Sequence, residues 1–145
     1  MISLVVSAWA GEQVWTAHAM TRVGLTETTP TAATNNVTIH ACRNEWESTQ
    51  VIVTGQADRL TSLSYQLGEF TAADGSRLPA PTVYQQYDVR IKNSSPKAPL
   101  AAGLYPDALV PLSPGESPEM ASFHGKQGMV NLRLWLDFHV PANVP

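Results

Sequence analysis

The chain has 145 residues and a net charge of −3, with 14% charged and 43% hydrophobic residues. This length fits one domain with its own core, and the hydrophobic fraction excludes a disordered chain. No window gathers Lys and Arg, so we expect neither a nucleic-acid partner nor a basic helix on a membrane surface.

Residues 1–12 are too short to span a membrane, which takes about 20 apolar residues. Leu4-Val5-Val6 followed by Ala8-Trp9-Ala10 has the form of a hydrophobic region with a cleavage site. Two interpretations stay open: a signal-peptide remnant that starts upstream, or a first strand. We assign residues 13–145 to the folded domain.

Alternation of apolar and polar residues predicts strands along the rest of the chain, and no helical period of twelve residues occurs. Before the last strand, we expect strands at 14–20, 37–41, 47–54, 60–67 and 83–91. In "MVNLRLWLDFHV", the apolar set Val130, Leu132, Leu134, Leu136, Phe138 and Val140 points one way, and Asn131, Arg133, Trp135, Asp137 and His139 point the other. This pattern predicts a strand with one face on a core and one face in water.

Residues 93–128 hold six prolines, which excludes a central strand because proline cannot donate to a ladder. We expect an ordered strap across the domain. The predicted fold is therefore all-β: an antiparallel two-sheet β-sandwich of immunoglobulin or jelly-roll type, with a long Pro-rich strap loop.

Arg43, Glu45 and Glu47 alternate onto one face of an extended chain. Two carboxylates about 6–7 Å apart along a strand approach the spacing of glycosidase acid pairs, but every E-x-E strand has this spacing. We favour a charged scaffold over a catalytic pair. Cys42 is expected as a small buried residue, and the four separated histidines predict no metal site and no cofactor.

Aromatic side chains are the candidate carbohydrate contacts, because flat rings stack on the apolar faces of sugars. Trp135 is the strongest candidate, since it lies on the polar face of the last predicted strand. Trp46 and Tyr105 are the other two. The alternative is that the strap or a neighbouring domain covers Trp135.

Three segments carry a family resemblance. They are Arg43–Gln50 ("RNEWESTQ"), Gly103–Leu112 ("GLYPDALVPL") and Leu134–Pro141 ("LWLDFHVP"). In this order they resemble the N-terminal β-sandwich domain of glycoside hydrolase family 123-like proteins, many of which are described only as containing domain of unknown function 4091. The resemblance covers roughly residues 13 to 145.

The resemblance implies a non-catalytic accessory or structural domain of a secreted, periplasmic or cell-surface bacterial protein. In the family, a downstream (β/α)₈ barrel of the same polypeptide carries catalysis, and characterised members look like β-N-acetylgalactosaminidases with an Asp-Glu pair. This chain has no Asp-Glu dipeptide, so no catalytic residue is carried over. The resemblance also implies a fragment that lacks its final strand or strands.

The motif residues Arg43, Glu45, Gln50, Tyr105, Pro106 and Asp107 are interpreted as structural. We expect Arg43 and Glu45 to tie a sheet to the strap, in a polar knot that includes Asp107. Three alternatives remain: an autonomous carbohydrate-binding module, a self-contained hydrolase using Glu45 and Glu47, and an adhesion or surface-layer domain. Fold alone does not decide among them.

Overall fold

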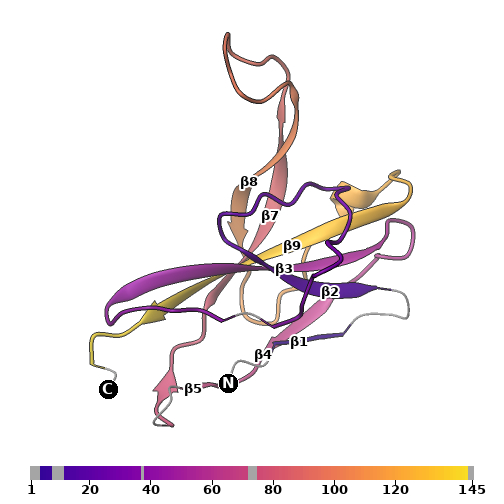
Figure 1. Cartoon of the computed structure of the whole chain (residues 1–145). Helices are drawn as coiled ribbons and strands as arrows, with labels where there is room; N and C mark the ends of the chain where they lie inside the picture. The colour runs from indigo at the N-terminus through magenta and orange to yellow at the C-terminus, as the bar shows by residue number, and fades with distance from the viewer. Residues whose placement is uncertain (1–3, 8–11, 37, 72–74, 144–145) are drawn as a thin grey trace.

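A computed structural model describes residues 4–7, 12–36, 38–71 and 75–143 (Figure 1). Its elements are β1 (Leu4–Ser7), β2 (Gln13–His18), β3 (Glu45–Gln56), β4 (Ser64–Leu67), β5 (Phe70–Thr71), β6 (Arg77–Leu78), β7 (Thr82–Ile91), β8 (Gly103–Pro111), the 3₁₀ turn η1 (Ala121–Phe123) and β9 (Met129–Val140). All strand pairs are antiparallel. The prediction of an all-β, antiparallel fold is confirmed.

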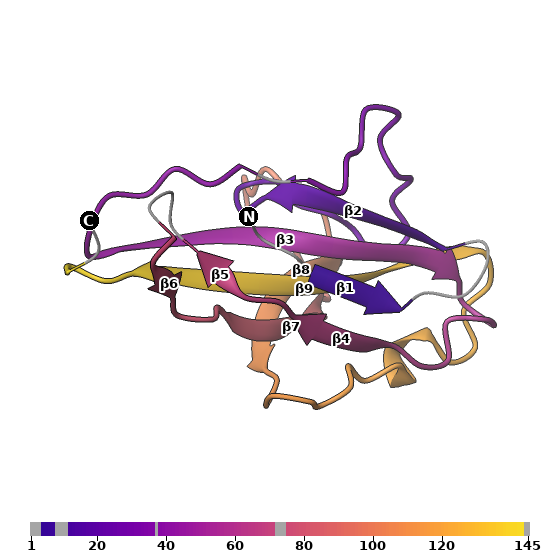
Figure 2. The same cartoon turned by 90° about the horizontal axis from the view of Figure 1, so that it is seen from below.

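A five-stranded sheet in the order β2-β3-β9-β7-β8 forms the body of the molecule. β3 and β9 pair over their whole length, from Glu45 opposite Val140 to Gln56 opposite Met129. Two short ladders, β1–β4 and β5–β6, lie on one side of this sheet (Figure 2). The long central pair therefore joins β2 on one side to β7 on the other.

The main core lies on the side of the two short ladders. The alternate apolar residues of β9 face it, and Leu134 is fully buried there. From the other side, the core is closed by Leu60, Leu63, Tyr65, Met120 and Phe123. Burying one such aliphatic or aromatic side chain contributes about 1.5–3 kcal/mol, so this face supplies most of the hydrophobic stabilisation. The predicted apolar face of the last strand is confirmed.

The opposite face of β9 is not the water-exposed face that alternation predicts. Asn131 and Arg133 are only 1% and 2% exposed, because the segment after β2 lies across them. Val23 of this segment packs on Trp15 and Ile52 in a second, smaller core. A period of two identifies the polar face of a strand, but it does not reveal what covers that face.

Side chains of the sheet hold the covering segment by its backbone. Gln50, Asn131 and Arg133 donate hydrogen bonds to backbone carbonyls at the end of β2 and in the segment that follows it. The acceptors are His18 (3.0 Å) and Thr21 (2.7 Å) for Gln50, Gly24 and Glu27 (2.8 Å each) for Asn131, and Val23 (3.0 Å) for Arg133. These bonds satisfy buried backbone groups of an irregular segment, which is why polar residues occupy a buried face.

The Pro-rich stretch 93–128 differs from the expected strap because it contains β8. This strand pairs with β7 and forms the edge of the sheet, so Pro106 and Pro111 lie where a missing backbone donor is tolerated. The β7–β8 hairpin projects away from the body (Figure 1). It leaves β9 after Gln85, the last residue of β7 that pairs with that strand.

Two further expectations are wrong. Residues 38–41 lie in no strand, although 37–41 alternate, because a strand also needs a partner edge; Val37 lies outside the described residues. Cys42 is exposed instead of buried. In the region 1–12, Leu4–Ser7 form β1 and pair with β4, whereas residues 1–3 and 8–11 are outside the described part.

Candidate functional site

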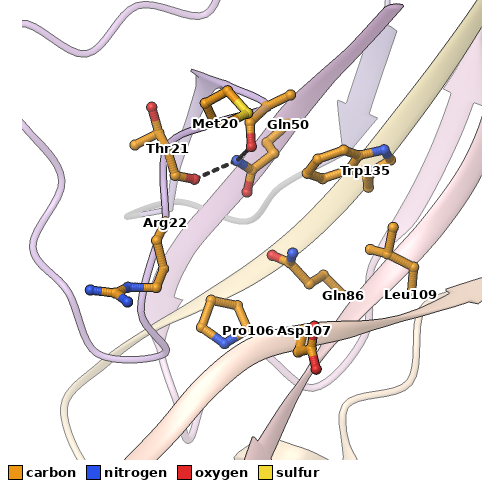
Figure 3. A pocket seen from close by; sticks show the side chains of 10 residues that line it. Met20, Thr21, Arg22, Gln50, Gln86, Pro106, Asp107, Leu109 and Trp135 are labelled. Atoms are coloured by element: carbon orange, nitrogen blue, oxygen red, sulfur yellow. Dashed lines mark hydrogen bonds between the residues drawn. The ribbon is translucent and has the colours of Figure 1, made fainter. Parts of the chain in front are cut away.

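A pocket of about 300 Å³ lies on the sheet face that the segment after β2 partly covers (Figure 3). Four neighbouring strands contribute to it, together with residues 19–22. The strand residues are Gln50 of β3, Trp135 of β9, Gln86 of β7, and Pro106, Asp107 and Leu109 of β8. The pocket thus forms where the hairpin turns away and leaves a gap beside the covering segment.

The indole of Trp135 forms one wall, and its orientation is fixed. Its Nε1 donates a 2.9 Å hydrogen bond to Oδ1 of Asp137, which also accepts from the hydroxyl of Ser48. With the indole N–H engaged, the half-buried ring presents carbon to the pocket (Figure 3). Such a ring is a rigid apolar platform.

Two amide side chains line the pocket beside this ring. The Nε2 of Gln50 is bound to carbonyls of the covering segment, which leaves its Oε1 for the pocket. The Oε1 of Gln86 is buried and has no hydrogen-bond partner. Both amide ends point toward the centre of the pocket (Figure 3). An unpaired buried acceptor costs about 1–3 kcal/mol, and this oxygen is shielded from solvent, so it is a cost to the fold rather than an open contact for a ligand.

The rim carries one charge of each sign and two exposed apolar side chains. The guanidinium of Arg22 lies 5.5 Å from the ring centroid of Tyr105, while Asp107 is exposed on β8. Met20 and Leu109 are 87% and 38% exposed. The entrance therefore combines two exposed apolar side chains with one residue of each charge.

Four predicted site residues meet at this pocket: Gln50, Pro106, Asp107 and Trp135. Tyr105 lies next to it beneath Arg22, and its hydroxyl donates a 2.6 Å bond to the carbonyl of Ala101. Of the three candidate carbohydrate contacts, only Trp135 lines the pocket.

The other predicted residues lie at the far end of β3. Trp46 is 61% exposed and stacks on His139, with centroids 4.7 Å apart and an interplanar angle of 26°. Glu45 accepts a hydrogen bond from the backbone N–H of Cys42. Arg43 is exposed. This end of the sheet is thus separate from the pocket.

The predicted polar knot between Arg43 and Asp107 is wrong, because no ion pair joins these two described residues. The buried ion pair is formed by Arg133 and Asp88, whose side chains are 3% and 9% exposed. It is bidentate, with N–O distances of 3.0 and 2.7 Å. It ties β9 to the projecting hairpin, because Asp88 lies on β7 beyond the point where that strand leaves β9.

Sequence reasoning missed Gln86, Arg22 and Met20 in the pocket. A usable signal exists only for Gln86: Gln85 and Gln86 are adjacent in a strand, so each face of that strand carries an amide. Gln85 pairs with the backbone of Glu119 through two 2.7 Å bonds, and Gln86 faces the pocket. Arg22 and Met20 lie in an irregular segment whose path no local pattern specifies.

Comparison with known proteins adds no assignment: no family model matches the chain, and no curated protein matches it. Within the part of the chain that the structure describes, no helix is long and apolar enough to cross a membrane. In the same residues, no group of three or more His, Cys, Asp or Glu side chains is placed to hold a metal ion.

Proposed function

We propose that this chain is a non-catalytic, all-β accessory domain of a secreted, periplasmic or cell-surface bacterial protein of the glycoside hydrolase type. One observation carries the proposal. The three segments of the family resemblance supply neighbouring walls of a single pocket: Gln50 from the first, Pro106 and Asp107 from the second, and Trp135 from the third. Segments far apart in sequence that meet at one place support a common purpose.

The environment of the carboxylates supports a non-catalytic role. Asp88 is paired with Arg133, Asp137 accepts from Trp135 and Ser48, and Glu45 accepts from a backbone N–H. These bonds hold the backbone and side chains in place. Glu45 and Glu47 belong to the far end of β3, away from the pocket, which argues against a hydrolase built on that pair.

The proposal also covers the second sheet and the partner of the domain. We interpret the two short ladders as part of the second sheet of an immunoglobulin-like or jelly-roll-like sandwich, and a downstream barrel of the same polypeptide as its partner. We propose that the β7–β8 hairpin is the part of this domain that contacts the barrel. Among the exposed large hydrophobic residues of the described chain, five of eight belong to it: Ile91, Leu100, Leu104, Leu109 and Val110. This concentration of exposed apolar side chains on one hairpin supports the proposed contact.

The test is to read the gene beyond codon 145 and to assay two proteins. We expect the frame to continue into alternating strands and helices. The complete polypeptide should hydrolyse a chromogenic glycoside, and the 145-residue chain should not. A stop codon directly after Pro145 would contradict the accessory role. Hydrolysis by the short chain that Glu45→Gln abolishes would replace it with a catalytic one.

A second candidate is an autonomous carbohydrate-binding module. The fixed indole of Trp135 in the pocket wall favours it, because a rigid aromatic ring can stack on the apolar face of a sugar. The two candidates differ in one result. An autonomous module retains its full glycan affinity without any attached domain, and its gene encodes no catalytic barrel.

A further inference from the structure

We propose that the guanidinium of Arg133 couples the β7–β8 hairpin to the segment after β2, so that a change in one loosens the other. Its Nη1 lies 3.0 Å from Oδ1 of Asp88 in the hairpin and 3.0 Å from the carbonyl oxygen of Val23 in the segment. Its Nη2 lies 2.7 Å from Oδ2 of Asp88. One buried group of β9 thus joins the hairpin to the segment, and this coupling does not depend on the proposed function.

The hairpin is anchored here because the pairing between β7 and β9 ends just before this point. β7 pairs with β9 over Thr82–Gln85 only. The register between β7 and β8 then shifts after Tyr87, and Asp107 is an extra residue of β8 at that place. A bulge of this kind disrupts the ladder and bends the strand. Asp88 lies directly beyond the bend, where its ion pair helps to fix the direction of the hairpin.

The segment after β2 is linked to the hairpin in two ways. The carbonyl of Val23 shares the guanidinium of Arg133 with the hairpin. The residue before it, Arg22, has its own guanidinium 5.5 Å from the ring centroid of Tyr105 on β8. Residues 19–22 and three residues of β8 form different sides of the pocket (Figure 3). A joint movement of the segment and the hairpin would therefore change the shape of the pocket.

Compensation of charge is the physical basis of the coupling. The side chains of Arg133 and Asp88 are 3% and 9% exposed, so the carboxylate neutralises a cation that water barely reaches. If residue 88 loses its charge, the guanidinium becomes an uncompensated buried charge, which is strongly unfavourable. The guanidinium then gains by moving toward water, and the carbonyl of Val23 loses its donor. A change in the hairpin thus loosens a segment on the other side of Arg133.

Native-state hydrogen exchange of the 145-residue chain tests the coupling. The reporters are the amides of Thr21, Gly24 and Glu27, whose hydrogen bonds lie within residues 18–27. In Asp88→Asn, which removes the charge and nearly keeps the shape, we expect these amides to exchange about tenfold faster or more, relative to the amides of β3. Asp107→Asn is the matched control, because it makes the same change at an exposed residue of the same hairpin. It should leave the three amides as they are in the wild type.

Three results with Asp88→Asn would overturn the proposal. They are unchanged exchange of the segment amides, an increase no larger than that in β3, and an equal increase in the Asp107→Asn control. Asp88→Glu decides the matter if Asp88→Asn does not fold, because it keeps the charge and displaces it by a methylene group. In that variant the segment amides and those of residues 89–91 should exchange faster together. Faster exchange in the hairpin with an unchanged segment would show that Arg133 does not couple them.

Discussion

At the scale of single residues, the Arg133–Asp88 ion pair joins β9 to the β7–β8 hairpin. Both side chains are almost completely buried and the pair is bidentate. Arg133→Met leaves the Asp88 carboxylate buried without its partner and frees the carbonyl of Val23. We expect the free energy of unfolding, measured by urea denaturation, to fall by about 3–5 kcal/mol.

A matched control is available in the ion pair between Arg77 and Glu69. Its atoms are 3.5 Å apart, and its side chains are 76% and 73% exposed. Arg77→Met should change stability by less than about 1 kcal/mol, because solvent screens exposed pairs. Adding Asp88→Leu to Arg133→Met should restore part of the lost stability, since it removes the buried carboxylate that has no partner. If the two arginine substitutions lowered the stability equally, burial would not be the reason for the effect of Arg133→Met.

The environment of the Tyr87 hydroxyl predicts how the free energy of unfolding changes at alkaline pH. Burial first, then its hydrogen bond to Glu119 and the charges of Glu119 and Glu116, raise the pKa of Tyr87 from 10.0 to about 12. The folded state therefore holds this proton more tightly than the unfolded state. The resulting stability is complete below pH 10 and is lost as pH rises from 10 toward 12.

Tyr87→Phe tests this dependence in urea titrations at several pH values. Between pH 10 and 12 the variant should lose less stability than the wild type. Burial and Glu116 also raise the pKa of Tyr65, so part of the slope remains in the variant. From pH 7 to 9 the stability difference between the two proteins should stay constant. Parallel curves up to pH 12 would show that the Tyr87 proton is not held by the fold.

At the scale of elements, the segment after β2 is held by side chains of the sheet and by one backbone hydrogen bond, from the N–H of Asn131 to the carbonyl of Leu25 at 2.8 Å. Asn131 donates to two of its carbonyls and accepts a 2.6 Å bond from the hydroxyl of Thr54. Asn131→Leu leaves these buried groups unpaired, at about 1–3 kcal/mol each. We expect faster hydrogen exchange in residues 20–28, with little change in the β7–β8 hairpin.

Asn93→Leu is the control for this experiment, because Asn93 is an exposed residue just beyond the end of β7. The same change of side chain there should leave exchange in residues 20–28 as it is in the wild type. Uniformly faster exchange over the whole sheet in Asn131→Leu would mean that the segment and the sheet open together, and the idea of a separately held cover would be wrong.

The strands themselves show what local pattern can and cannot predict. β9 was predictable because its alternation runs over twelve residues and one set faces a real core. Residues 37–41 alternate too, but pattern does not supply the partner edge that a strand needs. β8 was missed because its prolines argue against a central strand, whereas an edge strand tolerates them.

At the scale of the molecule, the pocket was only half predictable. Gln50, Trp135, Pro106 and Asp107 were identified from the sequence, but as parts of a scaffold or as separate contacts. Their meeting depends on strand order: β9 lies between β3 and β7 in the sheet, although it follows both of them, and β8, in the chain. The irregular segment that closes one side follows tertiary hydrogen bonds, which no sequence period encodes.

The sheet has a core on each face, and a cavity made in one core should affect stability differently from a cavity made in the other. Leu134 is 0% exposed in the main core, so Leu134→Ala should lower the free energy of unfolding by about 2–5 kcal/mol. Val23 belongs to the small core under the segment after β2. Val23→Ala should mainly speed hydrogen exchange in that segment, because the sheet retains its main core. Urea unfolding and native-state exchange measure both effects. A loss of protection in β9 as large for Val23→Ala as for Leu134→Ala would show that the two faces unfold as one unit.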